Sequence, residues 1–382
     1  MSARFLPHWW GALLWPLSVL SSRVPVESKG EAAKDQLVPE TVQRLRQVLG
    51  LGETPRASGP LRRAPRYMLD LFNAVADANG VSKSPGLLQG NVVRSYEDKV
   101  HGNQTWFYFN VTSVGRNEQL LKAELRLFKL REHSQPASQL CRVDLCELLD
   151  SSGTRVEVIS SRIIPLSAEG WQVFPVTQTV WQWVRNSSSN HGFMISAGIP
   201  SQPSAARFAK NGDANTDSRP FLVIFSEDHE LEALRPLDPT GHRPSRMKKE
   251  SVVSAMPSPL AQLPQSRKIR AVPLPTMLPC QRHPLYVDFE QIGWSGWIIS
   301  PRGYSAYYCQ GACPFPLGQG FKITNHATVQ SIVHALKLST ELGSPCCVPD
   351  NLHSINLLYF DNEENVVLRQ YRDMVAVSCG CH

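Results

Sequence analysis

Seven of the nine cysteines in this 382-residue chain follow residue 279, and thiols at such density form either disulfides or a metal site. An odd number cannot pair completely within one domain, so at least one of the seven has no partner within it. These cysteines are Cys280, Cys309, Cys313, Cys346, Cys347, Cys379 and Cys381.

Two short spacings among them suggest a threaded disulfide core. The segments CQGAC (309–313) and CGC (379–381) would close an eight-residue ring if two disulfides joined them. The residues inside that ring are mostly small, which would let another disulfide pass through, as a cystine knot requires. Spacing alone leaves many connectivities open. The interior positions are Gln310, Gly311, Ala312 and Gly380.

The adjacent cysteines Cys346 and Cys347 need different partners, because a bond between neighbours closes a small ring with a distorted peptide bond. On a strand, adjacent side chains point to opposite faces. Cys347 can therefore enter a knot only if Cys346 faces outward.

A zinc site is the alternative for these cysteines, with His382 as a further ligand. The spacings C-x3-C and C-x-C do not match the common structural zinc patterns. Disulfides also prevail over metal sites in secreted proteins. We therefore expect neither a metal nor a cofactor.

Residues 1–22 predict a secretory signal peptide, since Arg4 precedes an apolar run from Trp9 to Leu20 and two serines follow. The run is shorter than the ~20 apolar residues that span a bilayer, and Pro16 interrupts it. No other stretch is apolar enough to cross a membrane. We expect a secreted, extracellular product with no membrane span, which agrees with N-glycosylation sequons at Asn103, Asn110 and Asn186.

The charge of the chain divides near residue 270. Residues 271–382 carry six basic and eight acidic side chains, which gives a net charge of −2. Because the whole chain carries +6, residues 1–270 carry a net charge of +8. The basic residues are scattered rather than arranged in a stripe, which argues against nucleic acid as a partner.

Residues 23–246 are organised as an α+β segment. Two short amphipathic helices are predicted between about 40 and 80, in TVQRLRQVLG and YMLDLFNAVADANG, closed by Gly50 and Gly80. Helices this short must pack on another element. A β-rich region follows at about 90–228, with a helix over 178–185 and Thr177 as its N-cap. Its predicted strands are TWFYFNVTSV, LKAELRLF, RVEVISS, GFMISAG and PFLVIFSED.

Cys141 and Cys146 lie in this β-rich region, outside the C-terminal cluster. Five positions apart, they would face opposite sides of one strand, so a bond between them needs a break in the strand.

A proline-rich, basic linker over 247–279 separates this segment from the cysteine domain at 280–382. Furin-like convertases cut after Arg-x-x-Arg in an accessible, extended chain. Two such motifs lie at the linker, Arg243 to Arg246 and Arg267 to Arg270, and the second is the alternative cut. The motif from Arg63 to Arg66 also fits.

The span from Cys280 to His382 resembles a mature ligand of the transforming growth factor-β superfamily, bone morphogenetic protein branch. Upstream, YMLDLF, AELRLF and VTQTVWQWV resemble the family's propeptide. The implied fold is a small, disulfide-rich cystine-knot growth factor, with all-β hairpin fingers and one helix, after an α+β propeptide with a straitjacket-like helical segment and a β-rich arm. The matching segments are CQRHPLYVDFEQIGWSGWIISPRGY, CQGACPFPL, TNHATVQSIV, CCVPD, LLYFDNEENVVLRQY and DMVAVSCGCH.

The resemblance implies the disulfides Cys280–Cys347, Cys309–Cys379 and Cys313–Cys381. It also implies that Cys346 bridges to Cys346 of a second chain. A dimer agrees with the small core that ~100 residues can bury, and with the apolar helical segment NHATVQSIVHAL.

Two receptor surfaces are implied, and ordinary core or dimer packing is the alternative for the two tryptophans. The type I receptor wrist comprises Trp294, Trp297, Phe315, Pro316, Leu317, Gln319, Asn325, Val329 and Val333. The type II receptor knuckle comprises Ser300, Asn356, Leu358 and Leu368. The chain departs from the family where Ser300 and Asn356 replace the more usual alanine and serine.

The expected function is that of a secreted, disulfide-linked growth factor. Released from its propeptide, it would bring type I and type II serine/threonine kinase receptors together to drive Smad signalling. The resemblance also implies homodimers, heterodimers with related ligands, and antagonists of the chordin or noggin type. The alternatives are a non-signalling cystine-knot antagonist and a secreted enzyme. No G-x-S-x-G, H-E-x-x-H or phosphate-loop motif supports the enzyme.

Overall fold

The computed structural model describes residues 46, 49, 63–83, 86, 88–100, 106–131, 139–199, 206–211, 216–229, 278–317 and 322–382. The predicted signal peptide, nearly all of the first predicted helix, the linker motifs at 243–246 and 267–270, Asn103 and Gln319 lie outside these residues. Within the described ranges, none of the helices is long and apolar enough to cross a membrane.

The described helices are few and short. They are α2 (Arg66–Val75), α3 (Thr177–Arg185) and α5 (Asn325–Ala335), with single 3-10 turns at η1 (Ser187–Ser189) and η2 (Thr216–Ser218).

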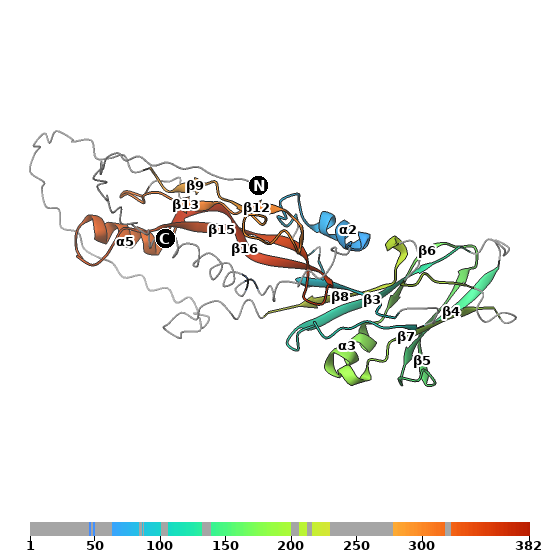
Figure 1. Cartoon of the computed structure of the whole chain (residues 1–382). Coiled ribbons are helices and arrows are strands. Elements are labelled where there is room, and N and C mark those ends of the chain that lie inside the picture. Colours follow the sequence, from blue (N-terminus) through green and yellow to red (C-terminus); the bar gives the residue numbers. More distant parts are fainter. Residues whose placement is uncertain are drawn as a thin grey trace, which may run out of the picture. The chain divides into compact units, whose positions relative to one another are not determined.

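The described strands fall into two groups along the chain (Figure 1). The first group is β1 (Val92–Glu97), β2 (Trp106–Phe107), β3 (Gln119–Lys129), β4 (Leu140–Leu148), β5 (Val156–Pro165), β6 (Gly170–Pro175), β7 (Phe193–Gly198) and β8 (Phe221–Glu227). The second group is β9 (Gln281–His283), β10 (Tyr286–Asp288), β11 (Ile298–Ser300), β12 (Gly303–Ser305), β13 (Tyr308–Gln310), β14 (Lys322–Ile323), β15 (Cys347–Phe360) and β16 (Val366–Cys381).

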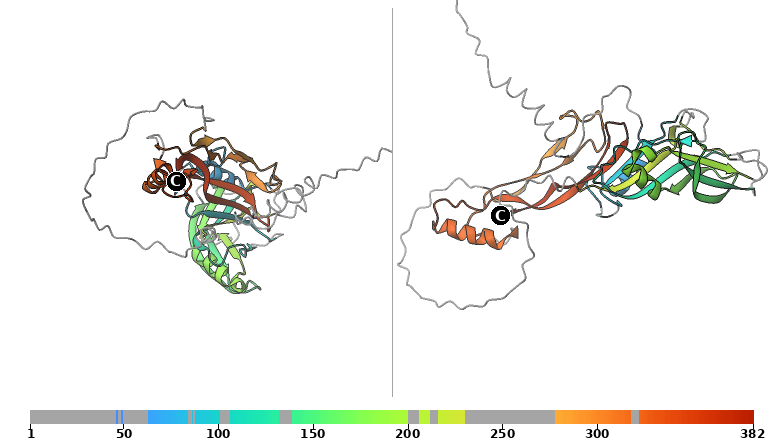
Figure 2. Two further views of the ribbon diagram at one scale, coloured as in Figure 1. Left: turned by 90° about the vertical axis from the view of Figure 1, so that its left-hand side faces the viewer. Right: turned by 90° about the horizontal axis from the view of Figure 1, so that it is seen from below.

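One eight-stranded sheet combines strands of both groups in the order β11-β15-β16-β1-β8-β3-β6, with β14 also paired to β16. Strand β1 joins the two parts, because it pairs antiparallel with β8 on one side and with β16 on the other. The long hairpin β15–β16 continues away from this junction, and α5 lies at its far end (Figures 1 and 2). The N-terminal segment and the cysteine domain therefore share a continuous backbone hydrogen-bond network.

A second sheet, β2-β7-β4-β5, encloses a core with β1, β3, β6 and β8. Alternate residues of β3 and β4 point into this core, including Leu125 and Leu145, and α3 contributes Val180 and Trp183. The Trp183 indole N–H donates to the Glu147 carboxylate at 2.9 Å, so the one polar atom of this buried ring is satisfied.

Four of the predicted strands match β3, β5, β7 and β8. The prediction for TWFYFNVTSV was too long, because only Trp106–Phe107 pairs with a neighbour, β7. Strands β1, β4 and β6 were missed. The sequence of β4 does carry the alternating signal, with Cys141, Val143 and Leu145 buried in turn.

Two predicted helix boundaries were wrong, the last residue of α2 and the first residue of α3. Helix α2 ends at Val75 rather than near Gly80, because Ala76 is extended and the Asp77 carboxylate instead accepts the N–H groups of Asn79 and Val81. Thr177 is the first helical residue of α3 and not its N-cap. Its hydroxyl accepts the Ala123 N–H at 3.0 Å, which ties the helix to β3.

Candidate functional site

Six of the C-terminal cysteines form three disulfides in the structure. The bonds are Cys280–Cys347, Cys309–Cys379 and Cys313–Cys381, the pairs that the family resemblance implied. Two of these bonds close the ring anticipated from the spacings of CQGAC and CGC. The sulfurs of Cys280, Cys313 and Cys381 all lie within 4.8 Å of one another. Because they are disulfide sulfurs and not thiolates, the zinc alternative does not fit them.

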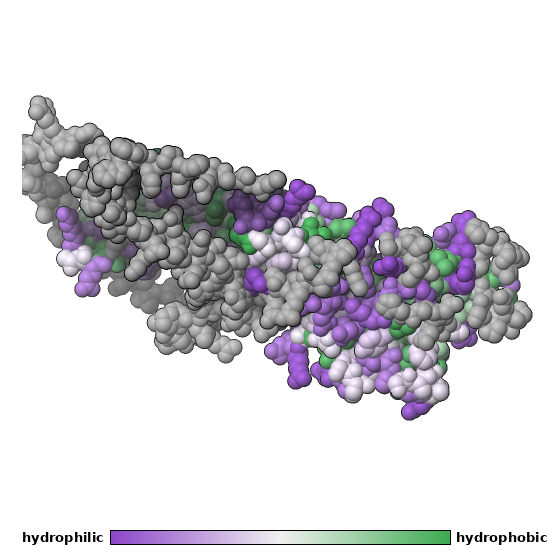
Figure 3. Space-filling view, in the orientation of Figure 1, coloured by the Kyte–Doolittle hydropathy of each residue, from purple (hydrophilic) through white to green (hydrophobic). Residues whose placement is uncertain are grey.

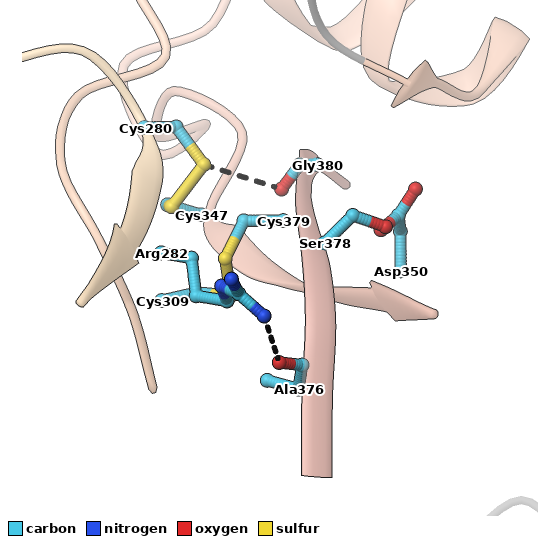
Figure 4. The surroundings of a disulfide bond; sticks show 9 residues. All are labelled: Cys280, Arg282, Cys309, Cys347, Asp350, Ala376, Ser378, Cys379 and Gly380. Carbon is cyan, nitrogen blue, oxygen red and sulfur yellow. Dashed lines mark hydrogen bonds between the residues drawn. A yellow bond between two sulfur atoms is a disulfide. The ribbon is translucent and has the colours of Figure 1, made fainter. Parts of the chain in front are cut away.

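The Cys280–Cys347 disulfide, which is not part of the ring, lies beside Cys379 and Gly380 (Figure 4). The sulfur of Cys280 lies 3.6 Å from the Gly380 carbonyl oxygen, and the Cys280 N–H donates to the Ala312 carbonyl at 2.9 Å. A Cβ at Gly311, whose φ is +136°, would lie 2.3 Å from the Pro279 carbonyl oxygen. A Cβ at Gly380 would lie 2.5 Å from the Lys322 carbonyl oxygen. Glycine at both ring positions is therefore a steric requirement.

Cys346 is the one exposed free cysteine of the chain, and it extends the hairpin by one pair. Its N–H donates to the His382 carbonyl at 2.8 Å, and the His382 N–H donates back at 3.0 Å. Cys347 lies opposite Cys381 in the next pair and enters the knot. Cys346 consequently presents its thiol to solvent on the other side, as strand alternation requires.

The predicted wrist residues divide into a buried and an exposed set. Trp294 and Trp297 are only 2% and 5% exposed. Trp294 stacks on Phe289, and Trp297 meets Tyr359 edge to face. Trp294 and Trp297 thus pack against aromatic side chains of the cysteine domain, and the guanidinium of Arg46 lies 5.8 Å from the centroid of the Trp297 ring. Their place in a receptor wrist stays a prediction.

The exposed wrist residues come from the loop after Cys313 and from α5. Phe315 and Val329 are 55% and 60% exposed, and Pro316 and Asn325 are exposed as well. Leu317 and Val333 are half-buried. On α5 only Ala327 and Ser331 are buried, and the apolar side chains of Val329 and Ile332 are 60% and 39% exposed. Exposed apolar surface of this kind is typical of protein–protein interaction sites.

The face of the molecule drawn in Figure 3 is mixed in character. In the view of Figure 3 the described residues carry hydrophilic and neutral groups with only small hydrophobic patches. That composition is typical of a solvated surface.

The predicted knuckle residues are covered by the N-terminal segment. Asn356, Leu358 and Leu368 are all 0% exposed, whereas Ser300 is partly exposed. Leu358 and Leu368 share one core with the α2 residues Met68, Phe72 and Val75. The remaining residues of that core come mainly from β1, β8, β15 and β16.

The chain after α2 continues this cover. The Gly80 carbonyl accepts the Asn356 N–H at 2.7 Å, and the Ser354 carbonyl accepts the Ser82 N–H at 3.0 Å. Gly80 has φ +75°, and a Cβ there would lie 2.9 Å from the Asn356 carbonyl oxygen. Only glycine allows this approach. The Asn356 side-chain amide, in contrast, has no hydrogen-bond partner for either of its polar atoms among the described residues.

A buried ion pair crosses the same boundary. Arg369 of β16 contacts Asp228, the residue after β8, at 2.6 Å. Asp228 is held in turn by Asn91, whose amide accepts its N–H at 2.8 Å and donates to its carbonyl at 2.7 Å. Sequence reasoning did not identify Arg369 or Asp228 as functional, because nothing local to either residue signals a partner about 140 positions away.

The two described glycosylation sequons have different surroundings. Asn186 is exposed at the end of α3. Asn110 is half-buried, and its amide donates to the carboxylate of Glu363, in the turn between β15 and β16, at 3.3 Å. A glycan on Asn110 would therefore lie at the boundary between the N-terminal segment and the cysteine domain.

Cys141 and Cys146 are both buried in β4 as free thiols. Burial raises the pKa of both thiols, so they stay protonated. The two residues do not bond to each other, as expected for positions on opposite faces of one strand.

Comparison with known proteins agrees with this arrangement. Residues 279–381 match the transforming growth factor beta like domain, and residues 29–225 match the TGF-beta propeptide. The chain is 31% identical to bone morphogenetic protein 8B of Mus musculus over 376 residues, covering 90% of each protein. It is also 31% identical to bone morphogenetic protein 2 of Tetraodon nigroviridis over 382 residues, covering 88% of this chain and 87% of the relative.

Proposed function

The chain belongs to the transforming growth factor-β family as a growth factor with its propeptide, not as an enzyme, and we propose that it acts as a secreted morphogen of the bone morphogenetic protein type. Its mature part would be a disulfide-linked dimer that brings type I and type II serine/threonine kinase receptors together and drives Smad signalling. Within this branch, the terminal CGCH favours a close likeness to anti-dorsalizing morphogenetic protein.

The observation that carries this proposal is the burial of the knuckle. Asn356, Leu358 and Leu368 lie on strands of the growth-factor hairpin, yet none is exposed in the precursor, where Leu358 and Leu368 share a core with α2, β1 and β8. Departure of the propeptide would expose a contiguous apolar surface, which is the kind of surface a receptor binds through a few buried anchors. The propeptide would thereby hold the ligand and mask its type II site.

The dimer is supported by the exposed thiol of Cys346 and by the open apolar face of α5. In a dimer this face would complete the type I wrist against the partner chain. A heterodimer with a related ligand would use the same thiol. Extracellular antagonists of the chordin or noggin type would compete for the same receptor surfaces.

The processing scheme is part of the proposal. The signal peptide over 1–22 is removed, and a convertase cuts after Arg246 or Arg270. The cut after Arg246 separates the propeptide of 23–246 from the growth factor of 280–382 and its linker, whereas the cut after Arg270 leaves residues 247–270 with the propeptide. Asn103, Asn110 and Asn186 would carry the glycans.

A Smad reporter assay with the purified, cleaved dimer tests this function. We expect a dose-dependent response in cells that express matching receptor pairs, and weaker binding of a type II receptor ectodomain to the uncleaved Arg246→Ala/Arg270→Ala precursor. Silence across all known receptor pairs would contradict signalling. Receptor binding without a Smad response would identify a cystine-knot antagonist instead.

A further inference from the structure

The motif from Arg63 to Arg66 is a third Arg-x-x-Arg sequence, and its scissile bond lies in the first turn of α2. The bond joins Arg66 to Tyr67, the first two residues of the helix. The Pro65 carbonyl accepts the N–H groups of Met68 at 2.9 Å and Leu69 at 3.4 Å. A convertase needs an extended, accessible backbone in its cleft, so it cannot bind this bond while α2 is formed.

Packing on both sides of the bond adds to this protection. Ala64 is buried, and the Tyr67 ring lies 6.0 Å from the ring of Phe221. The guanidinium of Arg126 sits 3.7 Å above the Tyr67 ring. The side chains of Arg63 and Arg66 are nevertheless exposed. The structure thus presents the arginines that a convertase recognises and withholds the backbone that it must cut.

Helix α2 depends on the growth factor for much of its stability. Its buried residues Met68, Phe72 and Val75 share a core with Leu358 and Leu368. A helix of ten residues is marginal in water by itself. This one also has no side-chain cap at Pro65 and no acidic residue in its first turn. When the growth factor leaves, α2 loses a large part of the apolar surface that holds it in place.

We propose that the Arg66–Tyr67 bond is a convertase site that is closed in the precursor and opens only after the growth factor has left the propeptide. The proposal rests on the release described under the proposed function. Hydrolysis adds water across the amide, leaving a carboxylate on Arg66 and an α-ammonium on Tyr67. That positive charge lies at the positive end of the helix dipole and opposes re-formation of α2. Cleavage therefore disfavours rebinding of the propeptide to the growth factor.

The first test compares the same bond in two states of the full propeptide. The Arg246→Ala/Arg270→Ala precursor and the separated wild-type propeptide are each treated with a purified furin-type convertase, and new N-termini are sequenced. We expect a fragment beginning at Tyr67 at least tenfold faster from the separated propeptide. Equal rates, or no cut in either state, would overturn the proposal. Failure to cut wild-type precursor at Arg246 or Arg270 would count against the processing scheme alone.

Variants separate local opening from general instability. Phe72→Ala in the uncleavable precursor removes the packing of α2 and should expose the Arg66–Tyr67 bond. Leu145→Ala removes comparable apolar volume from the core between the two sheets of the propeptide, which does not include α2. This variant should leave the Arg66–Tyr67 bond protected from the convertase. Equal cutting of both variants would refute the role of α2.

A further variant tests whether cleavage disfavours rebinding. Arg63→Ala removes an exposed recognition side chain that precedes the helix, so the bond should survive treatment. After convertase treatment, wild-type propeptide should rebind the growth factor at least tenfold more weakly than the Arg63→Ala propeptide. Equal rebinding would show that cleavage at Arg66 does not change the affinity of the propeptide for the growth factor.

Discussion

The guanidinium of Arg369 lies 2.6 Å from the carboxylate of Asp228, and the two side chains are only 7% and 8% exposed. This ion pair connects the long growth-factor hairpin to the end of the last propeptide strand. It lies beside the β1–β16 pairing, where Val92 is opposite Arg369. Backbone pairing and buried charge thus act at the same place.

The Asp228→Asn substitution should weaken the hold of the propeptide, because Arg369 would stay buried without its counter-ion. Loss of one partner from a buried pair costs about 3 kcal/mol, roughly a hundredfold in affinity. Surface plasmon resonance of the isolated propeptide on immobilised growth factor measures this.

The matched control for Asp228 is its neighbour Glu227, which pairs with Arg372 at 3.6 Å in a more exposed setting. Glu227→Gln should change the affinity by less than about threefold, because exposed ion pairs contribute little. Equal effects of the two variants would show that burial does not decide how much each ion pair contributes to the affinity of the propeptide for the growth factor.

The Phe72→Ala substitution should uncover the knuckle. Truncating a buried phenylalanine costs about 3 kcal/mol. We expect a type II receptor ectodomain to bind the precursor variant at least tenfold more tightly than wild-type precursor. Asn73→Ala, on the exposed side of α2, should have no effect. No gain in receptor binding by Phe72→Ala would contradict the masking by α2.

The Asn356→Ser substitution should tighten the hold of the propeptide. Both polar atoms of the Asn356 amide are buried under the propeptide without a partner among the described residues. Burying such atoms costs ~1–3 kcal/mol, and serine buries fewer of them. Dissociation of the propeptide should slow by roughly tenfold, whereas His353→Ala at an exposed position should not change it. Faster dissociation of Asn356→Ser would contradict this account.

The Cys346→Ser substitution should remove the covalent link between two chains and keep the knot. We expect half the apparent mass on a non-reducing gel, with the three intrachain disulfides unchanged by mass spectrometry. Cys347→Ser should instead disrupt the knot and impair secretion, because it breaks the Cys280–Cys347 bond. A Cys346→Ser product that still ran as a covalent dimer would contradict the assignment.

Acid should weaken one polar contact beside the knot. The Ser378 hydroxyl, and then the Lys322 ammonium, hold the pKa of Asp350 below 3.8, its ordinary value, against an opposing effect of desolvation. Because the folded pKa is lowered, the stabilisation is present above pH 3.8 and is lost as the pH falls through the folded pKa. An NMR titration of the Asp350 carboxyl carbon measures this, and a midpoint above 3.8 would contradict it.

The local pattern of apolar residues was sufficient to predict many of the helices and strands. The alternation in LKAELRLF predicted β3, and the three- and four-residue spacing of Met68, Leu71, Phe72 and Val75 predicted α2. Local pattern was insufficient for β1, since its buried Arg94 reads as a solvent-facing residue until its pairing with Glu118 is known. It also misplaced the end of α2, because the turn at Asp77 competes with the helix for the same N–H groups.

The sequence by itself determined that seven cysteines follow residue 279, that small residues lie inside the ring that CQGAC and CGC could close, and that Cys346 and Cys347 would face opposite sides of a strand. These follow from spacing and strand alternation, which are local properties. Only the tertiary structure decided which surfaces are open. The knuckle is covered because β1 pairs with β16, Asp228 pairs with Arg369, and α2 packs on Leu358 and Leu368. Contacts between residues so far apart in the chain leave no period in the sequence to read.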